Sequence, residues 1–115
     1  GRLRIIQEQV PGNQISLAHI IGGPQPIIYQ KLGLNPDIDY DGAAIGILTV
    51  VPYESSIIAA DIATKAADIY LGFVDRFSGT LIITGELAEV TTAVDEIVRY
   101  FRDEMGFAAC RITKR

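Results

Sequence analysis

The segment Ala66-Ala-Asp-Ile-Tyr-Leu-Gly-Phe-Val-Asp-Arg-Phe-Ser-Gly79 joins the end of an alanine-rich helix, a short apolar strand and a polar loop. A second apolar run, Thr-Leu-Ile-Ile-Thr, follows at residues 80–84, and Gly85-Glu86 opens an acidic helix. The loop Asp75–Gly79 carries a charge pair and an aromatic residue between the two predicted strands. Loops held by a rigid scaffold often carry functional residues. The segment therefore predicts a helix–strand–loop–strand–helix unit with a candidate functional loop at its centre.

The remaining pattern extends this unit into a sheet with helices. Strands are predicted at Leu3–Val10, Gln14–Ile21, Ala44–Val51, Ile69–Val74, Thr80–Thr84 and Phe107–Thr113, and helices at Pro26–Leu32, Glu54–Ala67 and Glu86–Met105. The strand at 44–51 is almost continuously apolar, which is typical of a central strand buried on both faces. Alternation along residues 14–21 predicts that Ile15 shares a face with Leu17 and His19. Mixed strands with two long helices predict an α/β (α+β) sandwich, with the helices on one face of the sheet.

Composition limits the class of protein. The chain has 115 residues, which fits one domain, and its net charge of −4 gives no electrostatic footprint for nucleic acid. No stretch approaches the roughly 20 apolar residues of a membrane span, and no leader pattern is present. The single cysteine, Cys110, cannot form an internal disulfide and fits a reducing compartment. These features predict a cytoplasmic domain without nucleic-acid or membrane partners.

The sequence offers little for catalysis or metal binding. The one histidine, His19, lies in a predicted strand away from any nucleophile, where a structural role is the common one. Asp37, Asp39 and Asp41 alternate like the start of a calcium loop, but the twelfth position is Leu48 instead of a bidentate glutamate. We therefore expect no enzyme activity, no metal and no cofactor.

Two blocks of sequence resemble a known family. The run from Lys65 to Val90 resembles the core of a bacterial microcompartment (BMC) shell protein, with an edge lysine, a strand, a pore loop, a strand, a glycine–acid turn and a helix. Residues 4–21 (Arg-Ile-Ile-Gln-Glu-Gln-Val-Pro-Gly-Asn-Gln-Ile-Ser-Leu-Ala-His-Ile-Ile) and 43–49 resemble the circularly permuted hexameric shell proteins of ethanolamine, propanediol and choline utilisation compartments. The resemblance covers nearly the whole chain.

This resemblance implies a fold and an assembly. The fold would be a permuted BMC-domain sandwich with a mixed, mainly antiparallel sheet, formed by residues 14–115, after an N-terminal strand extension at residues 1–13. Members form hexamers that tile into the compartment wall. In the permuted branch the leading strands of six copies form a small barrel that caps the pore. The barrel residues would be Leu3, Arg4, Ile5, Ile6, Gln7, Glu8, Gln9 and Val10.

The resemblance also implies roles for individual residues. Asp75, Arg76, Phe77, Ser78 and Gly79 would form the pore loop, where Arg76–Asp75 pairs could line or seal the opening. The hexamer edge would use Lys65 together with Gly22, Gly23 and Pro24. That edge lacks the arginine of the Pro-Arg-Pro found in relatives of standard order, so we expect altered edge contacts. Gly42 follows a long acidic loop and is a candidate bend point for a curved or open-screw assembly.

A second class of function stays open at this stage. The alternative is a small-molecule-sensing oligomer of ferredoxin-like architecture that binds its ligand between subunits, and it requires a cleft with convergent basic or backbone donors. The shell interpretation instead predicts self-association, other microcompartment shell proteins as partners, and encapsulated enzymes as candidate partners at the barrel. An enzyme is the third alternative, and it lacks a base–nucleophile pair.

Overall fold

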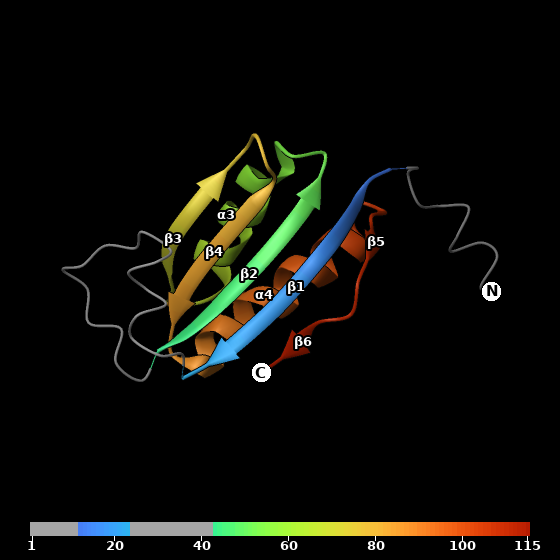
Figure 1. Cartoon of the computed structure of the whole chain (residues 1–115). Helices are drawn as coiled ribbons and strands as arrows, with labels where there is room; N and C mark the ends of the chain where they lie inside the picture. Colours follow the sequence, from blue (N-terminus) through green and yellow to red (C-terminus); the bar gives the residue numbers. More distant parts are fainter. Residues whose placement is uncertain (1–11, 24–42) are drawn as a thin grey trace.

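The computed structural model describes residues 12–23 and 43–115. Its elements are β1 (Gln14–Gly22), β2 (Ala44–Val51), α3 (Ser55–Ala66), β3 (Tyr70–Asp75), β4 (Thr80–Gly85), α4 (Leu87–Asp103), β5 (Ala108–Ala109) and β6 (Thr113–Lys114). Figure 1 shows both helices on the same face of one twisted sheet. The predicted fold class, a sheet of mostly antiparallel strands with helices on one face, is confirmed.

The sheet has the order β3-β4-β2-β1-β5, and β6 also pairs with β1. The pairs β1–β2, β2–β4 and β3–β4 are antiparallel, whereas β5 and β6 run parallel to β1. One side of the sheet therefore ends in β3, and the other ends in the two short strands β5 and β6 (Figure 1).

The register defines two ends of the sheet. At one end, Gln14 lies opposite Val51, and Thr80 lies opposite both Thr49 and Asp75; we call this the loop end. At the other end, Gly22 lies opposite Ala44, which lies opposite Gly85; we call this the glycine end. The start of β1 and the β3–β4 turn thus share the loop end, although about 60 residues separate them in sequence.

The core lies between the sheet and the two helices. On α4 the buried residues Val90, Ala93, Val94, Ile97 and Phe101 recur with the period of a helix. Gly46 in β2 allows α4 to approach the sheet, because a Cβ at this position would lie only 3.0 Å from Val90 Cγ1 and 2.9 Å from Ile83 Cγ1. The small residue is therefore required by packing at the centre of the sheet.

Helix α3 faces the core with alanines. Ala59, Ala60 and Ala63 are buried, as the alanine-rich pattern predicted, whereas Ile58 is exposed and Ile62 is half-buried. The isoleucines at these positions therefore lie outside the main core face. The short alanine side chains let α3 lie close to the sheet.

Two details of the sequence interpretation were wrong. A register shift between Ile15 and Leu17 turns Ile15 into the core with Ala18 and Ile20, away from Leu17 and His19. The expected strand Phe107–Thr113 is two short strands, β5 and β6, with residues 110–112 between them. Simple alternation cannot locate a bulge, because a bulge inserts one residue into the period of two.

The strand predicted at Leu3–Val10 and the short helix predicted at Pro26–Leu32 lie outside the described residues. Strand β2 is buried on its helix-facing side, while Ile47, Thr49 and Val51 on the other side are half-buried. Burial on both faces is therefore complete only toward its start, where Ala44 and Ile45 have no exposed surface.

Replacing Thr84 by valine is expected to raise the free energy of unfolding by about 1 kcal/mol. Thr84 is buried in β4, and within the described ranges its hydroxyl is the buried side-chain group without a hydrogen-bond partner. Valine keeps the shape and removes the cost of the unpaired hydroxyl. Denaturant unfolding at equal protein concentrations measures the change. Thr80→Val is the matched control, because the Thr80 hydroxyl lies 3.0 Å from Ser78 Oγ and its loss brings no gain; destabilisation by Thr84→Val would contradict the prediction.

Candidate functional site

The loop Asp75–Gly79 is a closed turn that is tied to β2 and to α3. The Gly79 N–H donates to the Asp75 carbonyl at 2.8 Å, which closes the turn between β3 and β4. The Val50 N–H donates to the Gly79 carbonyl at 2.9 Å and ties the turn to β2. The buried Ser56 hydroxyl donates to the same Asp75 carbonyl at 3.3 Å and ties it to α3. The loop is therefore held at its base, and its tip is presented to solvent.

The Asp75 carboxylate organises the tip of the loop. It accepts the Phe77 N–H and the Ser78 hydroxyl, each at 2.8 Å. These two donors lower the pKa of the Asp75 carboxyl, the Phe77 N–H most strongly. The Asp75 carboxylate therefore stabilises the turn from within.

Within one chain Arg76 lies against Phe77 and forms no ion pair with Asp75, and the Arg76–Asp75 pairs expected around the pore of a ring stay a prediction. The Arg76 guanidinium lies 5.1 Å from the centroid of the Phe77 ring, a cation–π contact worth about 0.5–1 kcal/mol at an exposed site. The ion pairs among the described residues are Asp61–Lys65, Glu96–Arg99 and Arg102–Asp103, and Arg76 is not in them. Phe77 is 76% exposed, so the tip carries a solvent-facing cation stacked on an aromatic ring.

Asp75 makes the stability of the loop depend on acid pH. Its pKa is lower in the folded chain than in the unfolded chain, so its contribution is complete above the ordinary aspartate value and is lost as the pH falls through the folded value. We expect the melting temperature of the unmodified protein to exceed that of Asp75→Asn at about pH 6, and the difference to shrink toward about pH 2.5. Thermal melts of both proteins across this range measure it. A difference that stays constant with pH would contradict the role given to the carboxylate.

The edge candidates lie at the glycine end, away from the loop. Lys65 lies in the last turn of α3, is 75% exposed and pairs with Asp61 at 2.9 Å. Gly22 donates its N–H to the Arg115 carbonyl at 3.1 Å, and Gly23 has a positive φ of 61°. Ala44 pairs with both Gly22 and Gly85, so these two glycines lie at the same end of the sheet. The Asp68 carbonyl, just after α3, lies 3.4 Å from the position of a Cβ on Gly85, which places the end of α3 there as well. Both groups of edge candidates therefore occupy one end of the sheet, several strands apart.

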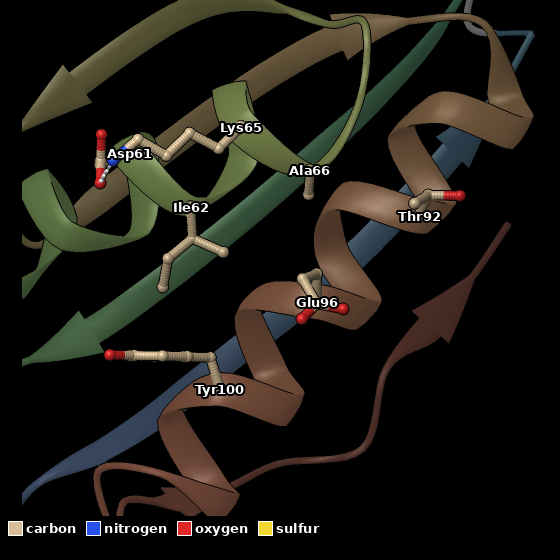
Figure 2. Close-up of a pocket in the computed structure, with 7 residues that line it drawn as sticks. All are labelled: Asp61, Ile62, Lys65, Ala66, Thr92, Glu96 and Tyr100. Carbon is tan, nitrogen blue, oxygen red and sulfur yellow. Dashed lines mark hydrogen bonds and ion pairs between the residues drawn. The ribbon is translucent and has the colours of Figure 1, made fainter.

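An open groove of about 480 Å³ lies between α3 and α4 (Figure 2). Its lining residues are Asp61, Ile62, Lys65, Ala66, Thr92, Glu96 and Tyr100. Lys65 is the basic residue in this lining. Its ammonium group forms an ion pair with Asp61, which Figure 2 marks with a dashed line. Glu96 is likewise paired with Arg99. The lining residues of this groove within one subunit therefore offer no convergent basic donors.

The exposed apolar residues of β3 were not singled out from the sequence. Tyr70, Leu71 and Phe73 are 58%, 46% and 44% exposed, although they belong to a regular strand. Because β3 pairs only with β4, these residues lie at the outer edge of the sheet. The sequence shows the apolar run of this strand. It does not show that the strand lies at the edge of the sheet, because that follows only from the strand order. Exposed apolar strand edges commonly mark interaction surfaces.

Part of the predicted site lies outside the described residues: the barrel positions from Leu3 to Val10, Pro24 at the hexamer edge, and Gly42 at the bend. Within 12–23 and 43–115, no three His, Cys, Asp or Glu side chains gather as a metal site. Neither described helix is long and apolar enough to cross a membrane. Burial raises the pKa of the Cys110 thiol, which disfavours the reactive thiolate.

Comparison with known proteins identifies the family. The BMC domain model matches residues 44–113, from β2 to β6. The bacterial microcompartment shell protein CutR of Streptococcus intermedius is 47% identical over 111 residues, which are 96% of this chain and 91% of CutR. The chain belongs to the BMC-domain family of bacterial microcompartment shell proteins. This shell protein is also 45% identical to the shell protein PduU of Salmonella typhimurium, over 96% of this chain and 92% of PduU.

Solved structures agree with this assignment. The CutR flat hexamer, form 1, superposes on this shell protein with a TM-score of 0.83 and 42% identity, covering 93% of this chain and 94% of that one. A CutR screw with a pitch of 41.9 Å superposes with a TM-score of 0.82 and 43% identity, covering 91% and 100%. One relative thus adopts both a flat hexameric and a screw arrangement, and this shell protein shares the fold of both.

Proposed function

We propose that this shell protein is a non-enzymatic building block of a bacterial microcompartment wall in the cytoplasm. Copies associate into a ring of six, or into an open screw, and these units assemble with other shell proteins. The observation that carries the proposal is the superposition with the CutR flat hexamer over almost the whole of both chains. A head-to-tail interface closes into a ring if its rotation allows and otherwise propagates as a helix, so one interface accounts for both forms.

In the ring, the loop end of each subunit points to the six-fold axis and the glycine end points outward. The loop Asp75–Gly79 then surrounds the pore, and Lys65 with Gly22–Pro24 lies on the rim that meets neighbouring rings. The opposite positions of the loop and of Lys65 in the subunit support this orientation. Six Arg76 side chains, each stacked on Phe77, would then surround the pore.

The N-terminal extension, residues 1–13, caps the pore as a barrel of six strands on the permuted BMC domain of residues 14–115. Support comes from β1, which begins at Gln14 on the loop end of the sheet. The described chain therefore enters β1 on the same side of the domain as the proposed pore loop. Residues alternate between the inside and the outside of a narrow barrel, and a capped pore does not pass metabolites freely. The barrel instead offers a docking knob for encapsulated enzymes.

Cross-linking tests the position of the loop. In a Cys110→Ser background, Phe77→Cys places six thiols around the axis, so a short bismaleimide should give a ladder of bands up to the hexamer on a denaturing gel. Asp95→Cys, on the exposed face of α4, is the matched control and should give few cross-links. If the Asp95→Cys control cross-links and Phe77→Cys does not, in protein that still assembles, the placement of the loop at the axis is contradicted.

A further inference from the structure

The groove between α3 and α4 has an apolar floor that solvent reaches. Figure 2 shows Ile62 pointing from α3 into the space between the two helices, and Ala66 follows one turn later on α3. Both side chains are half-buried, and the Tyr100 ring on α4 contributes to the lining while 39% exposed. Ile58 lies one turn before Ile62 on the same face of α3 and is 42% exposed. Apolar surface therefore follows α3 along the groove and past its lined part.

The shape of the groove suits a helix. The Asp68 N–H, just after α3, donates to Glu89 Oε1 near the start of α4 at 2.8 Å, so the two helices run antiparallel beside the groove. The α4 wall extends from Thr92 to Tyr100, about 12 Å along the helix axis. Small-molecule pockets bury most of the surface of their ligand, whereas this groove is open. A groove between two packed helices can instead take the side-chain ridge of a third helix.

The helix layer, defined as residues 54–68 and 86–104, is acidic. Its nine carboxylates belong to Glu54, Asp61, Asp68, Glu86, Glu89, Asp95, Glu96, Asp103 and Glu104, and its three basic groups to Lys65, Arg99 and Arg102. In the other described residues the one carboxylate side chain is Asp75, against the basic side chains of Arg76, Arg111, Lys114 and Arg115. Negative charge is therefore concentrated on the layer that contains the groove.

Two of these carboxylates line the groove itself, Asp61 on α3 and Glu96 on α4. They pair with Lys65 and Arg99. All four side chains are at least 40% exposed, and ion pairs at such positions contribute little to stability. Each carboxylate can therefore accept a further cation from a partner without loss of a strong internal contact.

We propose that this groove docks an amphipathic helix of another protein, with aliphatic side chains against Ile62, Ala66 and Tyr100, and lysine or arginine side chains facing Asp61 and Glu96. The aliphatic residues of that helix recur at positions i, i+3 or i+4, and i+7. Its basic residues orient it and favour this layer over surfaces of positive charge. No residue of the loop Asp75–Gly79 lines the groove, so the docking site is separate from the proposed pore and does not depend on a ring.

A synthetic peptide tests the docking. The probe is a fluorescein-labelled helix of about 18 residues, longer than the groove, with leucines on one face and lysines on the flanking positions. Fluorescence anisotropy with the assembled, unmodified protein should show saturable binding of one peptide per chain. One control peptide has the same composition with the leucines distributed around the helix, and another has glutamate in place of lysine. Each control should bind at least about tenfold more weakly.

Protein variants test the position of the site. Glu96→Lys should weaken binding of the probe about fivefold or more, because it places a cation against the lysines of the peptide. Tyr100→Ala should weaken it by a similar factor through the loss of apolar contact. Asp95→Lys is the matched control, since it makes the same charge change on α4 outside the groove lining. Its effect should stay below about twofold at about 0.15 M salt, and circular dichroism checks the fold of each variant.

The other outcomes contradict the docking site in different ways. Equal binding of the three peptides, or equal weakening by Asp95→Lys and Glu96→Lys, would show diffuse attraction to the acidic layer and overturn the proposal. Binding to dissociated chains alone would mean that a second copy covers the groove in the assembly, and would overturn it too. Assembled protein that never binds the probe would overturn the docking site while the shell function stands. A monomer that binds the probe through Glu96 and Tyr100 would support the docking site and contradict the shell function.

Discussion

Replacing Gly79 by alanine is expected to lower the free energy of unfolding by about 3 kcal/mol or more. Gly79 has a φ of +74°, which costs an alanine about 1–2 kcal/mol. An added Cβ would also collide with the Val50 carbonyl oxygen and would lie 2.9 Å from Tyr53 Cδ1. Relieving such a contact costs about 1–3 kcal/mol. Since the Val50 N–H binds the Gly79 carbonyl, any shift also strains the link between the loop and β2.

Gly12→Ala separates the two causes in the Gly79 variant. Gly12 also has a positive φ, +84°, but no atom of the described residues lies within 4 Å of the Cβ position. Its substitution should therefore cost only the backbone part, about 1–2 kcal/mol. Denaturant unfolding of both variants at equal protein concentration measures the two losses. Equal losses would contradict the collision at Gly79 and leave backbone conformation as the whole cause.

Truncation of Phe101 to alanine is expected to cost about 3–5 kcal/mol. Phe101 has no exposed surface and is among the largest fully buried side chains in the described core. Its ring meets Phe107 edge to face, with 4.9 Å between the centroids, and the Phe107 N–H donates to the Phe101 carbonyl at 2.8 Å. The loss would leave a cavity where α4 packs against Phe107.

Tyr100→Ala is the matched control for Phe101, because it removes a neighbouring aromatic ring from the same helix. Tyr100 is 39% exposed and lines the open groove, so its loss should cost about 1 kcal/mol or less. Guanidinium unfolding followed by circular dichroism gives both values. Similar losses for the two variants would show that burial at Phe101 is less complete than the structure describes.

Most of the fold could be predicted because periodicity and packing agree along the chain. The α4 stripe from Val90 to Phe101 has the helical period, and its burial follows directly. The run of residues 65–90 carried the family resemblance as well, since it joins α3, β3, β4 and α4 in one block. The bulge at Ile15–Leu17 could not be predicted, because nothing in a row of Ile, Ser and Leu marks where an extra residue enters.

The candidate site was predictable in position and less so in chemistry. The polar residues Asp75–Gly79 predicted a loop, and the structure has the β3–β4 turn there. The hydrogen-bond partner of the Asp75 carboxylate could not be predicted, because it depends on the backbone geometry of the turn. Within one chain the turn presents Asp75 with the Phe77 N–H and the Ser78 hydroxyl, and the Asp75–Arg76 pairs expected in a ring stay a prediction. The edge position of the exposed apolar residues of β3 is equally invisible in sequence, because it depends on strand order.

The absolute mass of the purified protein by light scattering, with negative-stain images of the same fraction, tests the central claim most directly. Six chains of 12.5 kDa predict a particle of about 75 kDa, seen as rings, sheets or tubes. Larger helical assemblies would retain the shell function with an open screw in place of a closed ring. A stable monomer or trimer without higher assembly at any accessible concentration would contradict the shell function and favour the ligand-sensing alternative.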